Sequence, residues 1–358
     1  MKYINIYSKG MISANSYGFI IPIIVNEKRL NDIGLKFNFF SEINQKIFDC
    51  DYLILDSKLF KYDWGADKVK KTRDFFFNLK ERVNKLIFLD LSDSSSTIIN
   101  EALEIVDIYF KNQVHKNKNI YLKPLYGRRI FTDYYHKKFG IKDINSEKKI
   151  PVKNKNNLKK IKILWNSYFS NYSIYGDLKI RLYKILPLNF FLNIPKLPIY
   201  INNKKNDVSC RMGLNYSKET VAFQRKKIND LLKDSYNFKK VSKRMYFKEL
   251  TNSKVLISPF GYGEINLKDF EAFFYGCILY KANMDHLETW PNFYLKGKTY
   301  IDFDWSLNNF QNKLDQIIRN FEQYFEIANY ANSLYNSYLH DKEYLEDFCI
   351  RLKNIFHN

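Results

Sequence analysis

Short apolar runs alternate with longer amphipathic stretches along the first third of the chain. Residues 2–8, 51–56 and 85–90 are apolar segments of strand length with polar flanks, and helix-length stretches such as residues 66–84 separate them. Strands that alternate with helices in this way pair in parallel and carry helices on both faces of the sheet. The pattern therefore predicts a doubly wound α/β unit at the start of the chain.

A polar break divides this unit from a second series of strands and helices. Residues 143–160 lose apolar positions and gain lysine and asparagine, which is typical of a linker. We expect a strand over residues 160–165 to open the second half. The further elements expected there are strands at 197–201, 254–258, 277–281 and 299–302, helices at 219–234 and 267–275, and mostly helical structure from residue 307 onward.

The length of 358 residues suits two domains better than one. We predict two Rossmann-like domains that face a cleft. Residues 1–150 form the first domain, residues 151–330 form the second, and residues 331–358 are C-terminal helices that pack back on both. Hydrophobic residues make up 46% of the chain, which is enough for packed cores and excludes wholesale disorder.

The formal net charge of +20 is concentrated in the middle of the chain. Residues 101–250 hold 33 lysines and arginines against 12 acidic residues, whereas the two ends are close to neutral. Such a region suits nucleic acid, an anionic membrane surface or phosphate-bearing substrates. No RNA-binding aromatic signature, zinc finger or paired recognition helix accompanies it, but a basic nucleic-acid-binding protein is kept as the alternative interpretation.

Neither a membrane span nor a metal or disulfide site is predicted. The longest nearly unbroken apolar run, residues 17–25, falls short of the roughly 20 residues of a membrane helix, and the N-terminus lacks the features of a secretory signal. We therefore expect a cytoplasmic protein. The four cysteines are scattered without metal-ligand spacing, and two Asp-x-Asp triplets, at 49–51 and 302–304, are interpreted as structural.

The most informative segment is a strand, a glycine turn, a helix and a second strand over residues 254–281. Ser258 ends the first strand, and Gly261 and Gly263 lie in the turn, where they let the backbone approach a ligand closely. Parallel sheets bind ligands at the carboxyl ends of their strands, and the start of the helix offers N–H groups to a phosphate. Glu264 and Glu271 are seven residues apart, so that on a helix they share one face and suit sugar hydroxyls.

At these residues the sequence resembles the donor-binding half of GT-B-fold, nucleotide-sugar-dependent glycosyltransferases, and it is most similar to their exostosin-like and bacterial surface-polysaccharide branches. The resemblance implies that Glu271 holds the ribose of the nucleotide. It also implies that Glu264 and the backbone of residues 262–264, Tyr262 among them, face the donor sugar and the diphosphate. Related enzymes often separate the two glutamates by eight positions rather than seven. The matching residues are Ser258, Pro259, Gly261, Gly263, Glu264, Glu271, Ala272 and Gly276.

The same resemblance implies a fold and an activity. It implies a GT-B α/β architecture and transfer of a sugar from a nucleotide sugar to a glycan or lipid-linked glycan acceptor, as in surface polysaccharide synthesis. The nucleotide sugar would be a substrate, and neither a cofactor nor a metal is expected. Beyond the acceptor, we expect peripheral contact with the anionic inner face of a membrane through the basic region, and no nucleic-acid partner.

Metal-free transfer needs cations that stabilise the departing diphosphate. The candidates lie in the basic region shortly before the glycine turn, and the planar guanidinium of arginine suits a diphosphate especially well. Asn166, just past the strand expected at 160–165, is a further donor-binding candidate because it would lie in a loop that faces the phosphates. The four cationic candidates are Arg211, Arg225, Lys243 and Arg244.

An inverting transfer also needs a general base that projects into the cleft from the first domain. Asp90 ends the strand at 85–90 and Asp93 follows it, and both are candidates, although capping of a helix is an alternative role for Asp93. Arg128 and Arg129 form a basic loop that could bind an anionic acceptor. His286 lies in a polar loop after the strand at 277–281, and we expect it to contact the acceptor rather than a metal.

Overall fold

The computed structural model describes residues 1–146, 150–169 and 204–357, so that the strand expected at 197–201 lies outside the described residues. The first half of the chain forms a six-stranded sheet in the order β2-β1-β3-β4-β5-β7, in which every neighbouring pair is parallel. Its strands are β1 (Lys2–Tyr7), β2 (Leu35–Phe40), β3 (Tyr52–Asp56), β4 (Lys85–Asp90), β5 (Ile108–Lys111) and β7 (Ile161–Ile163).

Helices cover both faces of this sheet, and the side chains of β4 show that both faces are buried. Leu86 and Phe88 point into one hydrophobic core, whereas Ile87 and Leu89 point into the other, and all four are buried. Successive strand residues face opposite sides of a sheet, so a strand that is buried on both faces is continuously apolar. The helices of this half are α1 (Ala14–Val25), α2 (Glu27–Asp32), α3 (Val69–Arg82) and α4 (Asn100–Ile105).

The strand that was expected to open the second half belongs to the first sheet, so that this prediction is wrong. In β7, Ile161 pairs with Tyr109 and Ile163 pairs with Lys111 of β5. The apolar pattern identified a strand at this position. It does not encode which sheet edge the strand joins, because that choice depends on the path of the preceding residues.

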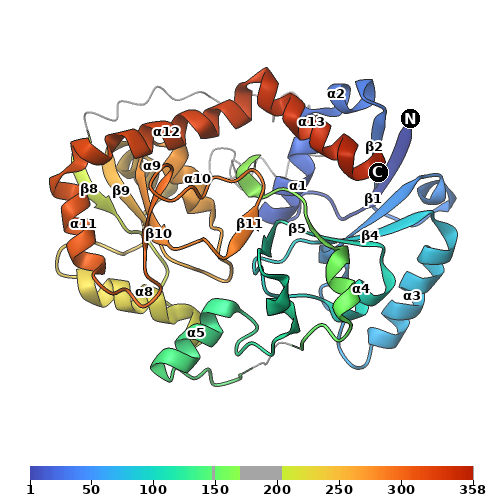
Figure 1. The fold of residues 1–358 in the computed structure, drawn as a ribbon, viewed down its shortest axis with the longest axis horizontal. Coiled ribbons are helices and arrows are strands. Elements are labelled where there is room, and N and C mark those ends of the chain that lie inside the picture. Colours follow the sequence, from blue (N-terminus) through green and yellow to red (C-terminus); the bar gives the residue numbers. More distant parts are fainter. Residues whose placement is uncertain (147–149, 170–203, 358) are drawn as a thin grey trace.

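The second sheet has four described strands in the order β12-β10-β9-β8, again all parallel. They are β8 (Asn206–Ser209), β9 (Ser253–Ser258), β10 (Ile278–Ala282) and β12 (Tyr300–Phe303). Helices α8 (Glu219–Leu232), α9 (Lys243–Asn252), α10 (Leu267–Phe274) and α11 (Phe310–Arg319) accompany them. Figure 1 shows the two sheets on opposite sides of the molecule, which confirms the predicted α/β GT-B architecture.

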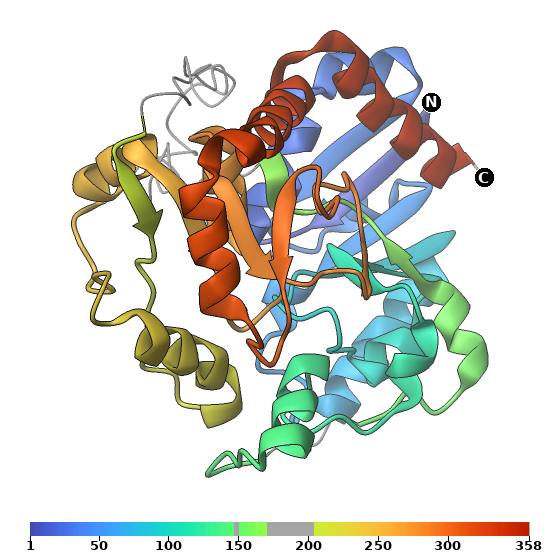
Figure 2. The same ribbon diagram turned by 60° about the vertical axis from the view of Figure 1, so that its left-hand side comes forward.

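One strand pair and one helix pair are among the contacts that join the halves near their facing edges (Figure 2). Strand β6 (Gln113–His115) of the first half pairs antiparallel with β11 (Leu287–Thr289) of the second. Helix α5 (Ile130–Phe139) packs on α8 of the second half, where the rings of Tyr135 and Phe223 lie 5.0 Å apart. The five short 3-10 helices of the described chain cover residues 45–48, 57–60, 118–122, 155–160 and 167–169.

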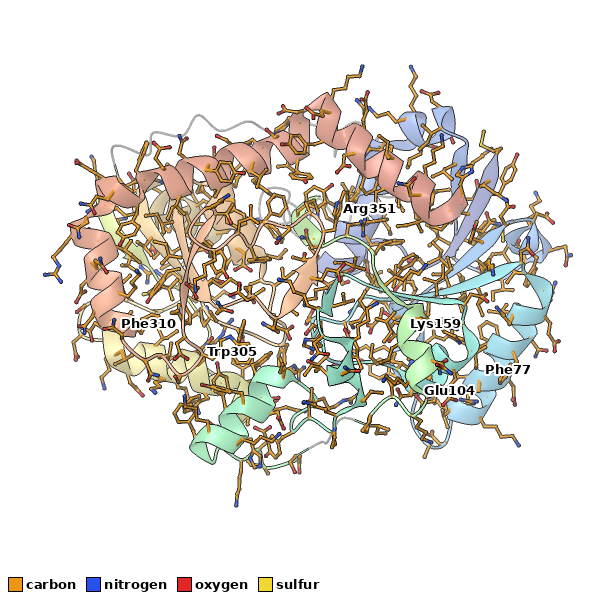
Figure 3. All side chains as sticks on the ribbon, viewed as in Figure 1. Phe77, Glu104, Lys159, Trp305, Phe310 and Arg351 are labelled. Atoms are coloured by element: carbon orange, nitrogen blue, oxygen red, sulfur yellow. The ribbon has the colours of Figure 1, made fainter. Side chains whose placement is uncertain are left out.

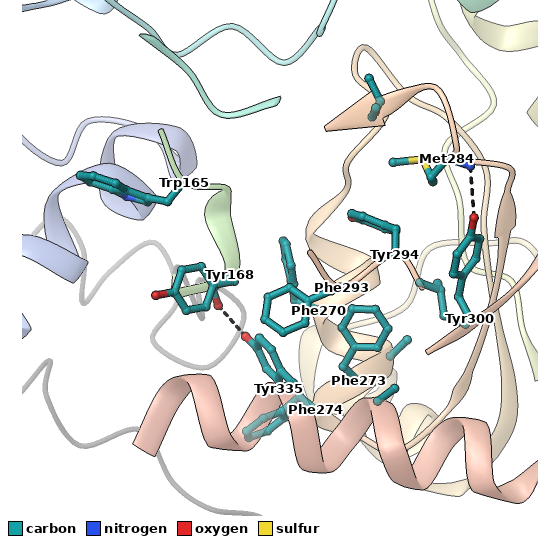
Figure 4. Close-up of a cluster of buried hydrophobic side chains, with 14 of the residues drawn as sticks. Trp165, Tyr168, Phe270, Phe273, Phe274, Met284, Phe293, Tyr294, Tyr300 and Tyr335 are labelled. Atoms are coloured by element: carbon teal, nitrogen blue, oxygen red, sulfur yellow. Dashed lines mark hydrogen bonds between the residues drawn. The ribbon is translucent and has the colours of Figure 1, made fainter. Parts of the chain in front are cut away.

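Two C-terminal helices run across both halves. Helix α12 (Phe321–His340) covers the second half, where Tyr335 packs among buried aromatic rings and donates a hydrogen bond of 2.7 Å to the carbonyl of Tyr168 (Figure 4). Helix α13 (Lys342–His357) returns to the first half, and Arg351 donates to the carbonyl of Ile163 in β7 (Figure 3). Among the described helices, none is both long and apolar enough to cross a bilayer.

Candidate active site

A cleft of about 240 Å³ lies between the two sheets. Every lining residue follows the carboxyl end of a parallel strand, which is where open α/β sheets bind ligands. From the first half, the lining residues are Ala14, Asn15, Ser92, Asp93, Asn112, Gln113, Asn166 and Ser167. From the second half, they are Tyr216, Gly261, Tyr262, Gly263, Ile265, Asn266, Leu267 and Phe270.

The glycine turn after β9 touches the loop after β4. A Cβ atom at Gly263 would overlap the backbone carbonyl of Asp93, so that only glycine allows this approach. The same carbonyl accepts a hydrogen bond of 2.6 Å from Nε2 of Gln113. The two halves therefore meet through backbone at the floor of the cleft.

Glu264 is fully buried against the first half rather than exposed in the cleft. Its carboxylate accepts hydrogen bonds from the backbone N–H of Ser95 at 3.0 Å and from the Ser95 hydroxyl at 2.6 Å. Burial raises the pKa of Glu264, although the two Ser95 bonds oppose that shift. A donor sugar could therefore contact Glu264 only after the two loops separate.

Helix α10 starts at the cleft, and its first turn is anchored by the buried carboxylate of Asp269. Asp269 accepts hydrogen bonds from the backbone of Asn266, from Ser258 Oγ at 2.6 Å and from the Tyr294 hydroxyl at 2.7 Å, and it forms an ion pair with Lys281. Ser258 therefore fixes the helix start instead of lining the cleft. The orphan N–H groups of this first turn give the cleft a partial positive charge.

Arg225 lies directly behind the glycine turn. Its Nε donates a hydrogen bond of 2.7 Å to the carbonyl of Phe260, and its guanidinium lies 5.0 Å from the ring of Tyr216. A Cβ at Gly261 would lie 3.2 Å from its Nη2. Burial lowers the pKa of Arg225, but an arginine stays charged at neutral pH. The cleft therefore has a fixed cation behind the turn.

Lys268, in the first turn of α10, is a second cation. Its buried Nζ has no hydrogen-bond partner among the described residues. Burial, together with the nearby charge of Arg225, lowers the pKa of Lys268 to about 8. This ammonium has no hydrogen-bond partner in the described part of the chain, and the nearby carboxylates of Glu271 and Asp269 offset the cost of its burial only in part. Such a group favours the binding of an anionic ligand.

Glu271 lies in α10 one turn beyond Leu267, which lines the cleft. Its carboxylate accepts a hydrogen bond of 2.8 Å from the hydroxyl of Tyr246 in α9. Burial raises the pKa of Glu271, and the charges of Lys268 and Lys243 oppose that shift. The Tyr246 hydroxyl thus holds this carboxylate, and the charges of Lys268 and Lys243 act on it from further away.

The other cations predicted for the diphosphate lie away from the glycine turn. Arg211 forms an ion pair of 2.8 Å with Glu249, and its Nη1 donates to the carbonyl of Lys239. Lys243 and Arg244 are exposed on the first turn of α9. Within this predicted set, Arg225 is therefore the residue that reaches the glycine turn.

The two candidate bases have different surroundings. Asp93 is exposed and lines the cleft, and its Oδ1 accepts a hydrogen bond of 2.7 Å from Asn15 Nδ2 at the start of α1. Asp90 is buried and forms an ion pair of 2.7 Å with Lys111. Burial alone would raise the pKa of Asp90, but the charge of Lys111 holds it below its usual value. Asp93 is thus placed to act on a substrate, and Asp90 anchors the end of β4.

The basic loop at residues 126–129 lies beside the cleft. Arg129 donates a hydrogen bond of 2.7 Å from its Nε to the carbonyl of Tyr262 in the glycine turn. Burial lowers the pKa of Arg129, and the nearby carboxylates of Glu264 and Asp93 act against that shift. Arg128 does not line the cleft but a separate groove beside residues 61–65 and 97–101, and it has a left-handed backbone with φ of 65°.

Asn166 is buried, and His286 is partly buried with both of its ring nitrogens shielded from solvent. The two ring nitrogens of His286 have no hydrogen-bond partner in the described structure, and its ring lies 4.9 Å from that of Trp305 (Figure 3). Burial lowers the pKa of His286 to about 4, so that it is neutral at pH 7. Asn166 lines the cleft but donates from Nδ2 to Thr289 Oγ1 at 2.8 Å and to the carbonyl of Pro291 at 2.7 Å, which joins the halves.

Sequence reasoning missed Lys268, Asp269 and Ser95. Lys268 lies three positions before Glu271, so that both project from one face of α10, and this spacing could have indicated it. Ser95 lies 169 positions before its partner Glu264, and no local pattern connects them. In the described part of the chain, no group of three or more His, Cys, Asp or Glu residues could hold a metal ion.

No model of a known protein family matches the chain, and neither does any curated protein sequence.

Solved structures do resemble it over nearly its whole length. HepE from Anabaena, in complex with UDP-glucose, has a TM-score of 0.46 and 9% identity, and the match covers 99% of this chain and 100% of that one. An alpha-glucosyltransferase in complex with UDP and a 13-mer DNA has a TM-score of 0.42 and 12% identity, with both chains fully covered. MnaA from S. aureus with UDP has a TM-score of 0.41 and 9% identity, covering 100% and 97%. At identities of 9–12% these structures assign no role to any residue of this chain, so that such roles are argued from its own contacts and distances.

Proposed function

We propose that this protein is a glycosyltransferase that binds a nucleotide sugar in the cleft between its two sheets. The observation that carries the proposal is the convergence of the α10 N-terminus, Arg225 and the buried Lys268 behind a glycine turn, with Glu271 on the same helix. Cations and helix N–H groups suit a diphosphate, and a neighbouring carboxylate suits ribose hydroxyls. Helix α10, with Arg225 of α8 behind the turn, thus presents complementary groups for the diphosphate and for the ribose of a sugar nucleotide.

In this proposal the diphosphate lies against the first turn of α10. Arg225 and Lys268 would stabilise the negative charge that grows on the leaving diphosphate, in place of a metal ion. Glu271 would accept hydrogen bonds from the ribose, and the Tyr246 hydroxyl would orient that carboxylate. The sugar would lie near Gly263, where the cleft faces the first half.

Asp93 would act as the general base in an inverting transfer. The acceptor hydroxyl oxygen forms a bond to the anomeric carbon, the bond from that carbon to the diphosphate oxygen breaks, and the hydroxyl proton passes to Asp93. Asn15 would orient the carboxylate through its 2.7 Å hydrogen bond. The proposed acceptor is a glycan or lipid-linked glycan of surface polysaccharide synthesis. The basic residues of the 101–250 region would hold the enzyme against an anionic membrane surface.

A panel of nucleotide sugars tests this function. At least one should raise the melting temperature and release its nucleoside diphosphate slowly in water, and EDTA should change neither result. A folded protein that ignores the whole panel but binds RNA with a steep salt dependence would instead indicate the nucleic-acid alternative.

A further inference from the structure

Asn112 is a half-buried residue in the wall of the cleft, directly after the carboxyl end of β5. Strands β4 and β5 are parallel neighbours, and Asp90 at the end of β4 pairs with Lys111, the residue before Asn112. The loop that carries Asp93 and the loop that carries Asn112 therefore leave the sheet side by side. The next residue, Gln113, agrees with this placement, because its Nε2 donates the 2.6 Å hydrogen bond to the carbonyl of Asp93.

The side-chain amide of Asn112 has no hydrogen-bond partner among the described residues. By contrast, the amide nitrogens of Asn15, Gln113 and Asn166, which line the same wall, all donate to protein oxygens. Gln113 Oε1 is unpaired too, but it is sealed from solvent, whereas neither amide atom of Asn112 is sealed. A ligand in the cleft can therefore reach both the N–H donor and the carbonyl acceptor of Asn112.

The groups around Asp93 suit a ligand that carries hydroxyls. The amide of Asn112 both donates and accepts, whereas the carboxylate of Asp93 only accepts. Asn15 uses its nitrogen to donate to Asp93 Oδ1 and to the carbonyl of Leu91, so that its own oxygen remains as a further acceptor. Acceptors thus outnumber donors here. Sugar hydroxyls supply the missing donors and can also accept from Asn112.

The charges at this wall disfavour an anionic ligand. Asp93 is the one formally charged side chain among the described residues that line the cleft. The charge of Arg129 acts on Asp93, but its Nε and Nη1 donate to the carbonyls of Tyr262 and Gly127. A phosphate or carboxylate group beside Asp93 would meet a like charge and would bring acceptors where donors are needed.

We infer that Asn112 binds the acceptor sugar beside Asp93, and that this sugar carries hydroxyl groups and no charge. One hydroxyl would bind the Asn112 amide while another meets the carboxylate of Asp93. This inference rests on the proposed function, because the bound sugar is the acceptor of the transfer. It assigns the first-half wall of the cleft to the uncharged end of a glycan rather than to a lipid phosphate.

Binding of simple sugars tests the inference without knowledge of the donor. The methyl glycosides of glucose, galactose, mannose, N-acetylglucosamine and N-acetylgalactosamine would be titrated into the full-length protein by saturation-transfer NMR. Methyl glucuronide and methyl galacturonide are the matched anionic compounds. We expect at least one neutral glycoside to bind roughly five-fold or more tightly than its anionic counterparts, which would meet Asp93 as a like charge.

Variants of Asn112 connect that binding to the cleft. Asn112→Ala should weaken it by roughly five-fold or more, about the value of one hydrogen bond between neutral groups. Asn112→Asp keeps the size but replaces the N–H donor with a second negative charge, and it should weaken binding at least as much. Asn119→Ala is the matched control, since Asn119 is an exposed asparagine outside the cleft, and it should bind as the wild type does.

Three results would each overturn the inference: no binding by any neutral glycoside, equal binding by a uronide, or neutral binding that Asn112→Ala leaves intact. Failure of the proposed function would look different, because it concerns another ligand. Nucleoside diphosphate affinity should be the same in wild type and Asn112→Ala. If the wild type binds no nucleoside diphosphate while a neutral glycoside still binds through Asn112, the donor assignment fails and the sugar site does not.

Discussion

The hydroxyl of Ser95 donates a hydrogen bond of 2.6 Å to the carboxylate of Glu264, which joins the loop after β4 to the glycine turn after β9. Glu264 is fully buried at this contact, and the backbone of Ser95 donates to it as well. Charge-assisted hydrogen bonds to a buried carboxylate are stronger than neutral ones. The carboxylate of Glu264 therefore holds the two halves together at the floor of the cleft. The sequence instead predicts that this carboxylate faces the donor sugar.

Gly263→Ala should separate these loops, because the added methyl group would overlap the carbonyl of Asp93. We expect a loss of about 1–3 kcal/mol in the free energy of unfolding and a larger loss of sugar transfer. Gly213→Ala is the matched control, since nothing lies within 4 Å of its added Cβ. Urea denaturation and initial rates check both variants, and an active, equally stable Gly263→Ala would contradict the close approach.

Lys268→Met should weaken nucleoside diphosphate binding by roughly 10- to 100-fold at pH 7, the value of one hydrogen bond to a charged group. The pKa of Lys268 is about 8, so that the ammonium loses its proton as the pH rises through that value. Wild-type affinity should therefore fall between pH 7 and 9.5, and this fall should be absent in the variant. Calorimetric titrations across this range measure both effects.

Lys268 should also make the stability of the ligand-free protein depend on pH. This stability should rise with pH, whereas the affinity for the nucleoside diphosphate falls. The pKa of Lys268 is lowered from 10.5 in the unfolded chain, so its contribution to stability is complete above about 10.5 and is lost as the pH falls through about 8. The difference in unfolding free energy between wild type and Lys268→Met should thus shift in favour of the wild type from pH 7 to 10. A constant difference would show that the amine is not buried.

Glu271→Gln should reduce nucleotide affinity by about 1.5–3 kcal/mol, because an amide presents one acceptor where the carboxylate presents two. Glutamine keeps an oxygen for the Tyr246 hydroxyl, so that the fold should persist. Tyr246→Phe is the companion variant, and we expect it to have a smaller effect through the orientation of Glu271. Unchanged affinity in a folded Glu271→Gln protein would refute the ribose assignment.

Asp93→Asn should keep nucleotide affinity and lose transfer by roughly 100-fold or more, because a general base contributes 10²–10⁴-fold. Asp90→Asn should behave differently. It leaves the ammonium of Lys111 buried without its counter-ion, which destabilises a protein by about 3–5 kcal/mol. Rates and urea melts of both variants separate the two roles, and full transfer by Asp93→Asn would exclude it as the base.

Local patterns predicted β1, β3, β4, β9, β10 and β12, the glycine turn and the position of α10, because apolar periodicity and glycine placement are local properties. They missed β2 and β8, which are less continuously apolar. They could not predict that β7 closes the first sheet, since pairing depends on residues far apart in the chain. They also could not separate Asp90 from Asp93, which differ through the ion pair of Asp90 with Lys111, 21 positions away. Ser258 likewise has a structural role, because its partner Asp269 is buried beneath the turn.

The central claim is that the cleft binds a nucleoside diphosphate through α10. Calorimetric titration of UDP, GDP, ADP, CDP and dTDP into wild type, Lys268→Met and Lys226→Met tests it most directly, because Lys226 is an exposed lysine of α8 paired with Glu219. We predict that at least one diphosphate binds the wild type and Lys226→Met equally, and Lys268→Met at least ten-fold more weakly. Binding to none of the five, or binding that Lys268→Met leaves unchanged, would contradict the claim.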